Sequence, residues 1–168
     1  MTLTKNQLRI MYALAALLVL APVAVPRSAH AFDYSGVGGK LGYSSSEDLD
    51  GTATLGVHAE MEQSGTRVHL IPNMMYWKVD GVRDLSPNLD LYYHFNPEGR
   101  VTPYLGGGLG LNFYRNDRLD RDNTELGLNL VGGVRFPGTA THYFLEGRYT
   151  ASDIPQAAVL AGVTFHGR

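Results

Sequence analysis

Apolar and polar residues alternate in eight segments of this 168-residue chain, and this pattern constrains the fold more than any other feature. A period of two residues is typical of a β-strand with one apolar face and one small or polar face. No segment beyond residue 31 follows the period of a helix, so we predict an all-β fold. The predicted strands span residues 37–43, 54–61, 68–77, 88–95, 101–114, 125–136, 142–149 and 157–165.

The glycine-rich run GGGLG at residues 106–110 requires a choice between a phosphate-binding loop and a strand. A dinucleotide-binding loop needs G-x-G-x-x-G before a helix, but the sixth position here is Leu111. With a period of two, three of these glycines share the small and polar face of a long strand. We interpret them as leaving room in a crowded interior for neighbours such as Arg135 and Glu125. Gly107, on the opposite face, is expected to mark a bend or a bulge.

The first 31 residues have the three parts of a secretory signal peptide. A basic start is followed by an almost wholly apolar run over residues 10–25 and by the cleavage signal Ala29-His30-Ala31. The apolar run is shorter than the roughly 20 residues of a membrane-spanning helix, which disfavours the alternative of an uncleaved anchor. We therefore predict a signal peptide at residues 1–31 and one domain at residues 32–168.

Loss of this segment makes the chain more acidic, because it contains three of the 14 basic residues and none of the 16 acidic ones. The net charge then changes from −2 to about −5, which argues against nucleic acid as a partner. The chain has no cysteine, so disulfides do not stabilise the exported protein.

Connections rich in Gly, Pro, Asn, Asp and Ser separate the predicted strands. Longer and shorter connections alternate, as they do in small membrane barrels. The longer ones are predicted at residues 44–51, 78–86, 115–123 and 150–156, and the shorter ones at residues 62–66, 96–100 and 137–141.

A soluble lipocalin-like barrel also alternates, with its apolar face inward, so the composition of the polar face has to decide between the two classes. That face carries nearly balanced charges and many glycines. Long charged residues in a narrow interior need small residues opposite them and partners of opposite charge, whereas a face in water needs neither. We therefore place the polar face inside, with a lumen charge network formed by Lys40, Glu60, Asp90, Glu125, Arg135, Glu146 and Arg148.

Aromatic residues gather at the predicted strand ends, as in the two aromatic girdles of a membrane barrel. Aromatic residues that filled a soluble core would not be sorted in this way. We accordingly predict an eight-stranded antiparallel up-and-down transmembrane β-barrel with both ends in the periplasm. The predicted upper girdle comprises Tyr43, Trp77, Phe113 with Tyr114, and Tyr149, and the predicted lower girdle comprises Phe95, Phe136, Tyr143 and Phe165.

The segments TPYLGGGLGLNFY, LGLNLVGGVRF, FLEGRYT and AGVTF resemble the small outer-membrane β-barrel domain family, of the OmpA-barrel and OmpX-like kind. The resemblance covers essentially all of the chain after residue 31 and implies a location in the outer membrane. It also implies a final aromatic residue that the outer-membrane assembly machinery recognises, a place held by Phe165. This fold serves structural, adhesive and enzymatic members, so the resemblance does not imply a single function.

Few residues of the sequence suggest chemistry. His58, His94 and His142 fall on the inward face, where we expect them to share hydrogen bonds rather than bind a metal or catalyse a reaction. The sequence has no match to the His-x-Ser-Asn run of lipid A deacylases. The connection 115–123 lacks the glycine and glutamate spacing of an EF-hand, although it contains Asp117, Asp120 and Asp122. Its arginines are expected to meet the phosphates of lipopolysaccharide: Arg115, Arg118 and Arg121.

The sequence thus predicts an integral outer-membrane protein with a structural or surface-interaction role, no enzymatic activity and no cofactor. The charge network is expected to stabilise and plug the barrel, because side chains fill an eight-stranded interior. The alternatives are a minor porin-like channel and a lipid A-modifying enzyme. Expected partners are outer-membrane lipid, lipopolysaccharide and the assembly machinery, and a monomer is favoured. Pro72 cannot donate a ladder hydrogen bond, so we expect a bulge or a strand end there.

Overall fold

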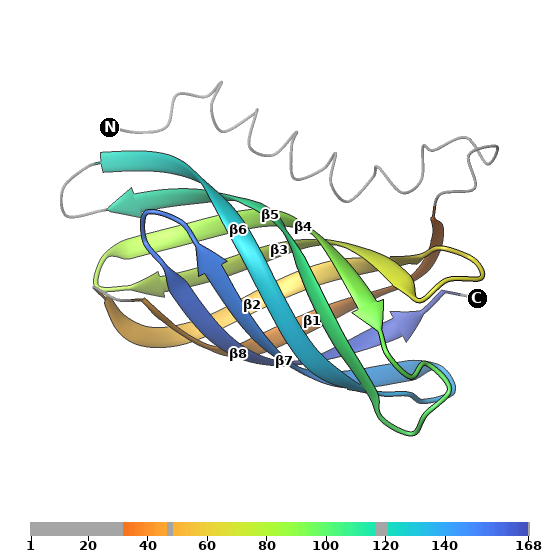
Figure 1. Cartoon of the computed structure of the whole chain (residues 1–168). Helices are drawn as coiled ribbons and strands as arrows, with labels where there is room; N and C mark the ends of the chain where they lie inside the picture. The colour runs from red at the N-terminus through yellow and green to blue at the C-terminus, as the bar shows by residue number, and fades with distance from the viewer. Residues whose placement is uncertain (1–31, 47–48, 117–120, 168) are drawn as a thin grey trace.

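The chain folds into a closed barrel of eight antiparallel strands, in which consecutive strands pair and β1 also pairs with β8 (Figure 1). The computed structural model describes residues 32–46, 49–116 and 121–167, so the predicted signal peptide lies outside the described residues. The predicted all-β, up-and-down barrel is confirmed. The strands are β1 Asp33–Ser46, β2 Leu49–Glu62, β3 Val68–Val79, β4 Val82–His94, β5 Thr102–Asn116, β6 Arg121–Phe136, β7 Thr141–Ala151 and β8 Gln156–His166.

The two ends of the barrel differ in what they carry. The start of β1 and the end of β8 lie together at one end, termed the terminal end, where the Gly167 amide donates to the Ser35 carbonyl at 2.9 Å. The opposite end is termed the hairpin end and carries the connections β1–β2, β3–β4, β5–β6 and β7–β8. Figure 1 shows the β3–β4 turn at the left and the C-terminus at the right.

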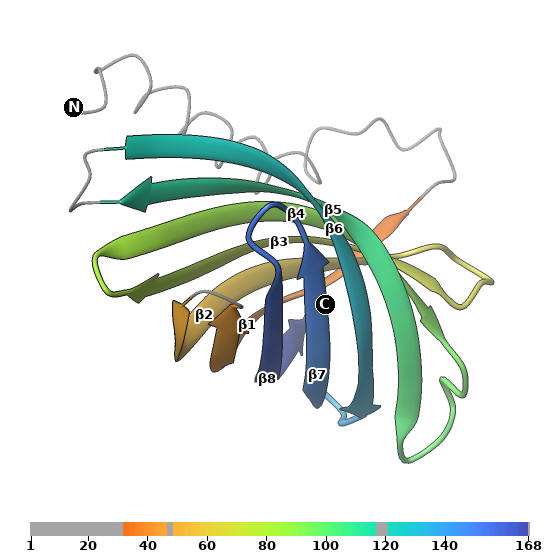
Figure 2. The same cartoon turned by 60° about the vertical axis from the view of Figure 1, so that its left-hand side comes forward.

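The predicted alternation of longer and shorter connections is wrong: the strands continue into the connections at the hairpin end, and the β3–β4 connection there is shorter than the β4–β5 connection at the terminal end. The predicted connection at residues 78–86 reduces to a two-residue turn, Asp80-Gly81, between β3 and β4. Both turn residues have positive φ values, 51° and 82°, which a type I′ hairpin turn requires and which Asp-Gly adopts readily. Strands β5 and β6 form a long curved hairpin (Figure 2). With 15 and 16 residues they exceed the roughly 9–11 residues needed to cross a bilayer.

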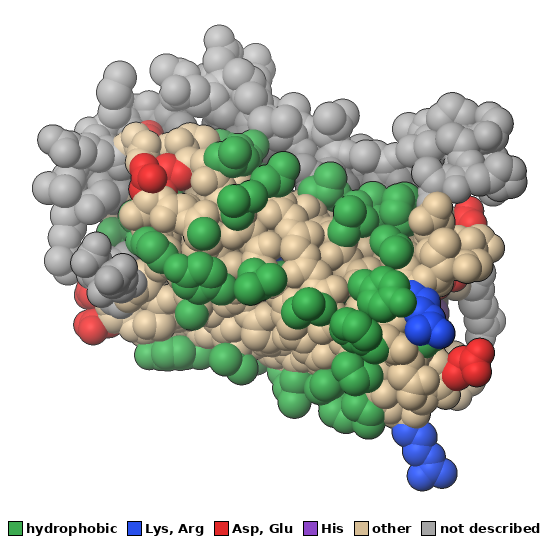
Figure 3. Space-filling view, in the orientation of Figure 1, with side chains coloured by type: hydrophobic (Ala, Val, Ile, Leu, Met, Phe, Trp, Pro, Cys, Tyr) green, Lys and Arg blue, Asp and Glu red, His purple; other side chains and the backbone are tan. Residues whose placement is uncertain are grey.

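Side-chain exposure confirms the predicted assignment of the two faces. Leu41 and Val159 on the outer wall are both 69% exposed, whereas Asp90 and Glu146 in the lumen are 0% and 2% exposed. Figure 3 shows hydrophobic side chains over the middle of the visible wall, with charged side chains toward its ends. A soluble barrel has the opposite arrangement, with its apolar face inside. Among the described residues, no helix is long and apolar enough to cross a membrane.

Neither Pro72 nor Gly107 forms a bulge. Pro72 pairs with Leu89 on β4, whereas the ladder to β2 skips it and resumes in the same register. The expected bulge or strand end is therefore wrong: the missing N–H leaves a local gap in one ladder while β3 continues. Gly107 pairs with both neighbouring strands in continuous register, so no bulge occurs there.

The inward-facing glycines lie against larger side chains and the neighbouring backbone. A Cβ atom on Gly108 would collide with Asp90 and with the backbone of β4. The glycines therefore leave room in a crowded lumen, as predicted, although their neighbours are not the predicted Arg135 and Glu125. Other inward-facing glycines lie against large side chains in the same way: Gly38 against His58, Gly106 against Tyr92, and Gly162 against Phe144.

Candidate functional site in the barrel lumen

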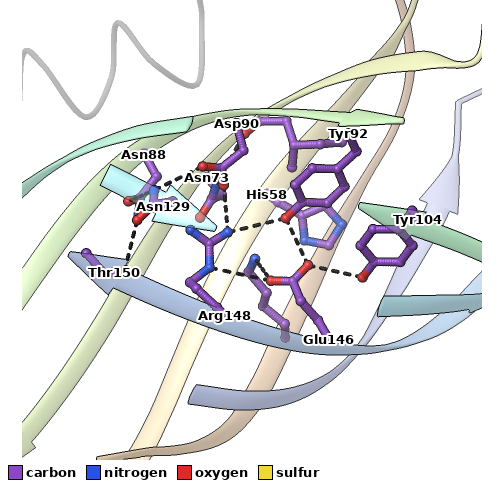
Figure 4. Close-up of polar contacts among 12 residues, drawn as sticks. His58, Asn73, Asn88, Asp90, Tyr92, Tyr104, Asn129, Glu146, Arg148 and Thr150 are labelled. Carbon is purple, nitrogen blue, oxygen red and sulfur yellow. Dashed lines mark hydrogen bonds and ion pairs between the residues drawn. The ribbon is translucent and has the colours of Figure 1, made fainter. Parts of the chain in front are cut away.

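Two ion pairs between strands that are not neighbours lie in the middle of the lumen (Figure 4). Lys40 Nζ on β1 lies 3.0 Å from Glu146 Oε1 on β7, and Arg148 Nη2 on β7 lies 2.6 Å from Asp90 Oδ2 on β4. Glu146 and Arg148 are two residues apart on one strand, so both point inward. Arg148 Nε lies 3.5 Å from Glu146 Oε1, which links the two pairs. These four residues, each with a side chain no more than 5% exposed, are termed the central layer.

Two tyrosines complete the coordination of Glu146. The hydroxyl groups of Tyr92 and Tyr104 donate to Glu146 Oε2 at 2.8 and 3.1 Å. Their rings stack with centroids 5.0 Å apart. A buried carboxylate is stable only when it is paired and hydrogen-bonded, and Glu146 has both kinds of partner.

Amide side chains perform the same role around Asp90. Asn73 and Asn129 each donate from Nδ2 to this carboxylate, at 2.8 and 3.0 Å. Asn129 also donates to Asn88 Oδ1 at 2.8 Å and accepts from the Thr150 hydroxyl at 2.9 Å. Hydrogen bonds therefore run across the lumen from β3 and β4 to β6 and β7 (Figure 4).

A second polar group surrounds Glu60 near the terminal end. Glu60 Oε1 lies 2.9 Å from Arg135 Nη1 and 2.7 Å from His69 Nδ1. Glu60 Oε2 lies 3.1 Å from His142 Nε2, and His142 Nδ1 in turn lies 2.9 Å from His166 Nε2. These five residues come from five different strands and are termed the terminal-end cluster.

A third group, termed the hairpin-end layer, corrects one prediction. Trp77 is 3% exposed, and its indole Nε1 donates to Gln156 Oε1 at 2.8 Å. Gln156 Nε2 donates to the Tyr114 hydroxyl at 2.6 Å. The placement of Trp77 and Tyr114 in the upper girdle is therefore wrong, because both side chains are buried in the lumen. The alternation along β3 directs Trp77 into the lumen and the preceding Tyr76 toward the outer wall.

The structure brings together six of the seven residues of the predicted charge network, in the central layer and the terminal-end cluster. Glu125 does not join them: it lies nearer the hairpin end, half-buried, and accepts a hydrogen bond from Asn123. The other predicted girdle residues lie on the outer wall: Tyr43, Phe95, Phe113, Phe136, Tyr143, Tyr149 and Phe165.

Sequence reasoning missed the residues that hydrogen-bond to the carboxylates. Tyr92 and Tyr104 donate to Glu146, and Asn129 donates to Asp90, but the sequence analysis predicts none of these contacts. The alternation that locates Asp90 also places these residues inside the barrel. The sequence does not show which inward residues contact each other. Asn129 and Asp90, for example, are 39 positions apart, and no local pattern links them.

Two small cavities separate the three groups. One of about 30 Å³ lies between the terminal-end cluster and the central layer, and one of about 20 Å³ lies between the central layer and the hairpin-end layer. A water molecule needs roughly 10–15 Å³, so each cavity has room for one or a few waters. Some of the buried atoms without a hydrogen-bond partner in the protein belong to residues that line these cavities: Nδ1 of His58 and His94 and Nε of Arg135 in the first, and Asn112 Nδ2 and Arg148 Nη1 in the second. Water in the cavities would satisfy these atoms.

The predicted histidines lie in the lumen, and their contacts are with other protein groups. His58 Nε2 lies 2.8 Å from the Thr164 hydroxyl, and His94 stacks edge-on against His69 with ring centroids 4.1 Å apart. Within the described part of the chain, no group of three or more His, Cys, Asp or Glu side chains is arranged to hold a metal ion.

The predicted loop at residues 115–123 is described only at its two ends. Arg115 Nε lies 3.8 Å from Asp122 Oδ1, across the β5–β6 ladder. Asp117, Arg118, Asp120 and the side chain of Arg121 lie outside the described residues.

A comparison with protein families connects this architecture to a known group. Residues 13–165 match the family described as the outer membrane protein β-barrel domain. The chain belongs to this family. The apolar outer wall then faces lipid, and the protein is located in the outer membrane, as the sequence predicts. The orientation stays a prediction of the sequence analysis: with both ends in the periplasm, the terminal end faces the periplasm and the hairpin end faces the cell surface.

Solved structures of other small outer-membrane proteins share the fold. Neisserial surface protein A aligns with a TM-score of 0.66 and 19% identity, over 80% of this chain and 96% of that one. Ail, the attachment invasion locus protein of Yersinia pestis, aligns with a TM-score of 0.55 and 11% identity, over 80% and 97%. The outer-membrane enzyme PagL aligns with a TM-score of 0.51 and 15% identity, over 76% and 97%. At these identities the likeness concerns the fold alone. A comparison with curated protein sequences finds no significant match.

Proposed function

We propose that this protein is a structural outer-membrane barrel with a plugged lumen, which supports the envelope and displays its short hairpins at the surface. The observation that carries the proposal is the central layer, where Arg148 and Asp90 pair across the lumen beside Lys40 and Glu146. An eight-stranded barrel is just wide enough for its side chains to fill. Ions that crossed this layer would have to break buried ion pairs, so the layer is a barrier to conduction.

We also propose that the protein is not an enzyme. The two cavities are too small for a lipid substrate, and the histidine contacts support a packing role. His69 and His142 are both bound to Glu60, and His58 is bound to Thr164. The alignment with PagL does not favour the enzymatic alternative, because a shared barrel fold accommodates unrelated functions.

Single-channel recording in planar lipid bilayers tests the plug. We expect the folded wild-type protein to give no stable conductance steps. The double variant Glu146→Ala, Arg148→Ala removes half of the central layer and should admit ions. A matched control, Leu145→Ala with Tyr149→Ala, changes the outer wall of the same strand and should stay closed.

Stable steps from the wild-type protein would contradict the plug and favour the minor porin alternative. A closed double variant would show that the central layer is not the barrier. Release of acyl chains from labelled lipopolysaccharide by the wild-type protein would instead favour the lipid-modifying enzyme.

A further inference from the structure

The cavity between the terminal-end cluster and the central layer is lined by residues with buried nitrogen atoms that have no hydrogen-bond partner in the protein. These atoms are Nδ1 of His58, Nδ1 of His94 and Nε of Arg135. His58 and His94 are 6% and 2% exposed, so bulk water solvates neither ring. The three residues belong to β2, β4 and β6, which are not neighbours in the barrel, so they approach the cavity from different parts of the wall.

The carboxylates at this cavity already have protein donors. Glu146 is bound by Lys40 and by two tyrosine hydroxyls. Glu60 is bound by Arg135 and by two histidines. Among the residues that line the cavity, all of which the structure describes, no buried carboxylate oxygen lacks a partner. The fixed charges of these two acidic and two basic residues balance, and the unsatisfied groups are nitrogen atoms only.

His58 and His94 differ from the other titratable side chains around the cavity, because neither has a carboxylate partner in the described part of the chain. His58 Nε2 faces the Thr164 hydroxyl, and the His94 ring makes edge-on aromatic contacts. The other charged and titratable groups around the cavity are the central layer, the terminal-end cluster, Tyr92 and Tyr104, and all of them are bound to protein partners.

The protonation state of the two histidines decides which ligand suits the cavity. A neutral imidazole accepts a hydrogen bond at one nitrogen, so a water molecule can accept from Arg135 Nε and donate to a histidine. A protonated imidazole donates from both nitrogens, so the cavity then presents only donors and one uncompensated positive charge. A monatomic anion accepts hydrogen bonds, balances that charge and fits a volume of about 30 Å³.

We propose that this cavity binds one halide ion together with one proton on His58 or His94. The proton and the halide enter as a pair, so the net charge of the lumen does not change. They enter from the terminal end, where the side chain of Arg135 is 13% exposed. Without the proton, the cavity holds water. The proposal goes beyond the structural role and does not depend on the plug, because the ion binds on one side of the central layer without crossing it.

Urea unfolding in lipid vesicles, followed by Trp77 fluorescence, tests the site in two salts at equal ionic strength. Sodium chloride supplies the halide, and sodium gluconate supplies an anion too large for the cavity. At about pH 5, chloride at about ten times its Kd should raise the folding equilibrium constant roughly tenfold, because only the folded protein has the site. At about pH 8, where an ordinary imidazole is neutral, the two salts should give equal stability.

Two matched variants locate the site. His94→Phe keeps an aromatic ring beside His69 and Tyr104 but removes the nitrogen donor, so it should lose most of the chloride effect. His166→Phe makes the same change at an exposed histidine that does not line the cavity, so it should retain the effect. Heat-modifiable migration on SDS gels shows whether each variant is folded.

Crystals of the wild-type protein grown in bromide at about pH 5 give a measurement that needs no variant. We expect an anomalous bromide peak in the cavity, within hydrogen-bond distance of Arg135 Nε. A cavity without bromide would overturn the proposal, as would equal stability in chloride and gluconate at this pH. A chloride effect that is undiminished in His94→Phe, or equally large at both pH values, would also overturn it. None of these results depends on whether the lumen conducts ions.

Discussion

Breaking the Arg148–Asp90 pair should destabilise the folded barrel strongly. Asp90 is fully buried and Arg148 nearly so, with 2.6 Å between Nη2 and Oδ2. The substitution Arg148→Met preserves much of the volume but leaves Asp90 with only the amide donors of Asn73 and Asn129. Removing one partner of a buried ion pair costs about 3–5 kcal/mol. Because two amides still solvate the carboxylate, we expect the lower limit, about 3 kcal/mol.

The double variant Asp90→Asn, Arg148→Met separates pairing from packing. Neutral replacement of both members of a buried ion pair is often close to neutral in stability, so the double variant should recover most of the loss. Glu146 remains paired with Lys40 in every variant, which limits secondary effects.

Urea unfolding of the protein in lipid vesicles measures these free energies. Trp77 is the single tryptophan of the chain and is buried in the lumen, so its fluorescence reports directly on barrel unfolding. Arg100→Met, in an exposed turn, serves as the control and should change stability by less than about 0.5 kcal/mol. A loss below about 1 kcal/mol for Arg148→Met, or a double variant as unstable as the single one, would refute the reasoning.

Two further predictions concern the two faces of the wall. Gly108→Val should prevent folding, because a side chain at this position collides with Asp90 and the β4 backbone; the assay is loss of the heat-modifiable band on SDS gels. The control Gly147→Val lies on the outer wall with only ordinary contacts and should fold. Equal yields of the two folded variants would contradict the crowded lumen. Brominated lipids should quench wild-type tryptophan fluorescence weakly, since Trp77 faces the lumen. They should quench the fluorescence of the variant Tyr76→Trp, Trp77→Phe strongly, because its tryptophan faces the lipid. Similar quenching of both proteins would mean that Trp77 faces the lipid, as the girdle prediction has it.

The connections show a limit of sequence-based prediction. Residues 78–86 contain enough Gly, Asp and Ser to resemble a long loop, yet Asp80-Gly81 alone forms the turn. Asp-Gly between two valines is itself a strong hairpin signal, so a prediction based on turn type would have found it. Pro72 shows a different limit, because a missing donor does not reveal whether a strand ends or only one of its two ladders is interrupted.

The alternation of residue types determines much of this protein, because it is a local property of the chain. It identifies eight strands, their two faces and the inward position of Lys40, Asp90 and Glu146, and the belts of aromatic residues then indicate a membrane barrel. Each of these features depends on residues that are near one another in sequence.

The tertiary structure decides which inward residues meet. Arg148 pairs with Asp90 from 58 positions away, and Trp77 finds its hydrogen-bond acceptor Gln156 at a distance of 79 positions. Strand register also places Lys78, Arg83 and Arg115 opposite one another, although they belong to three different strands. The physical reason is that strand order and register place distant residues at one level of a closed barrel, and a period of two says nothing about that level.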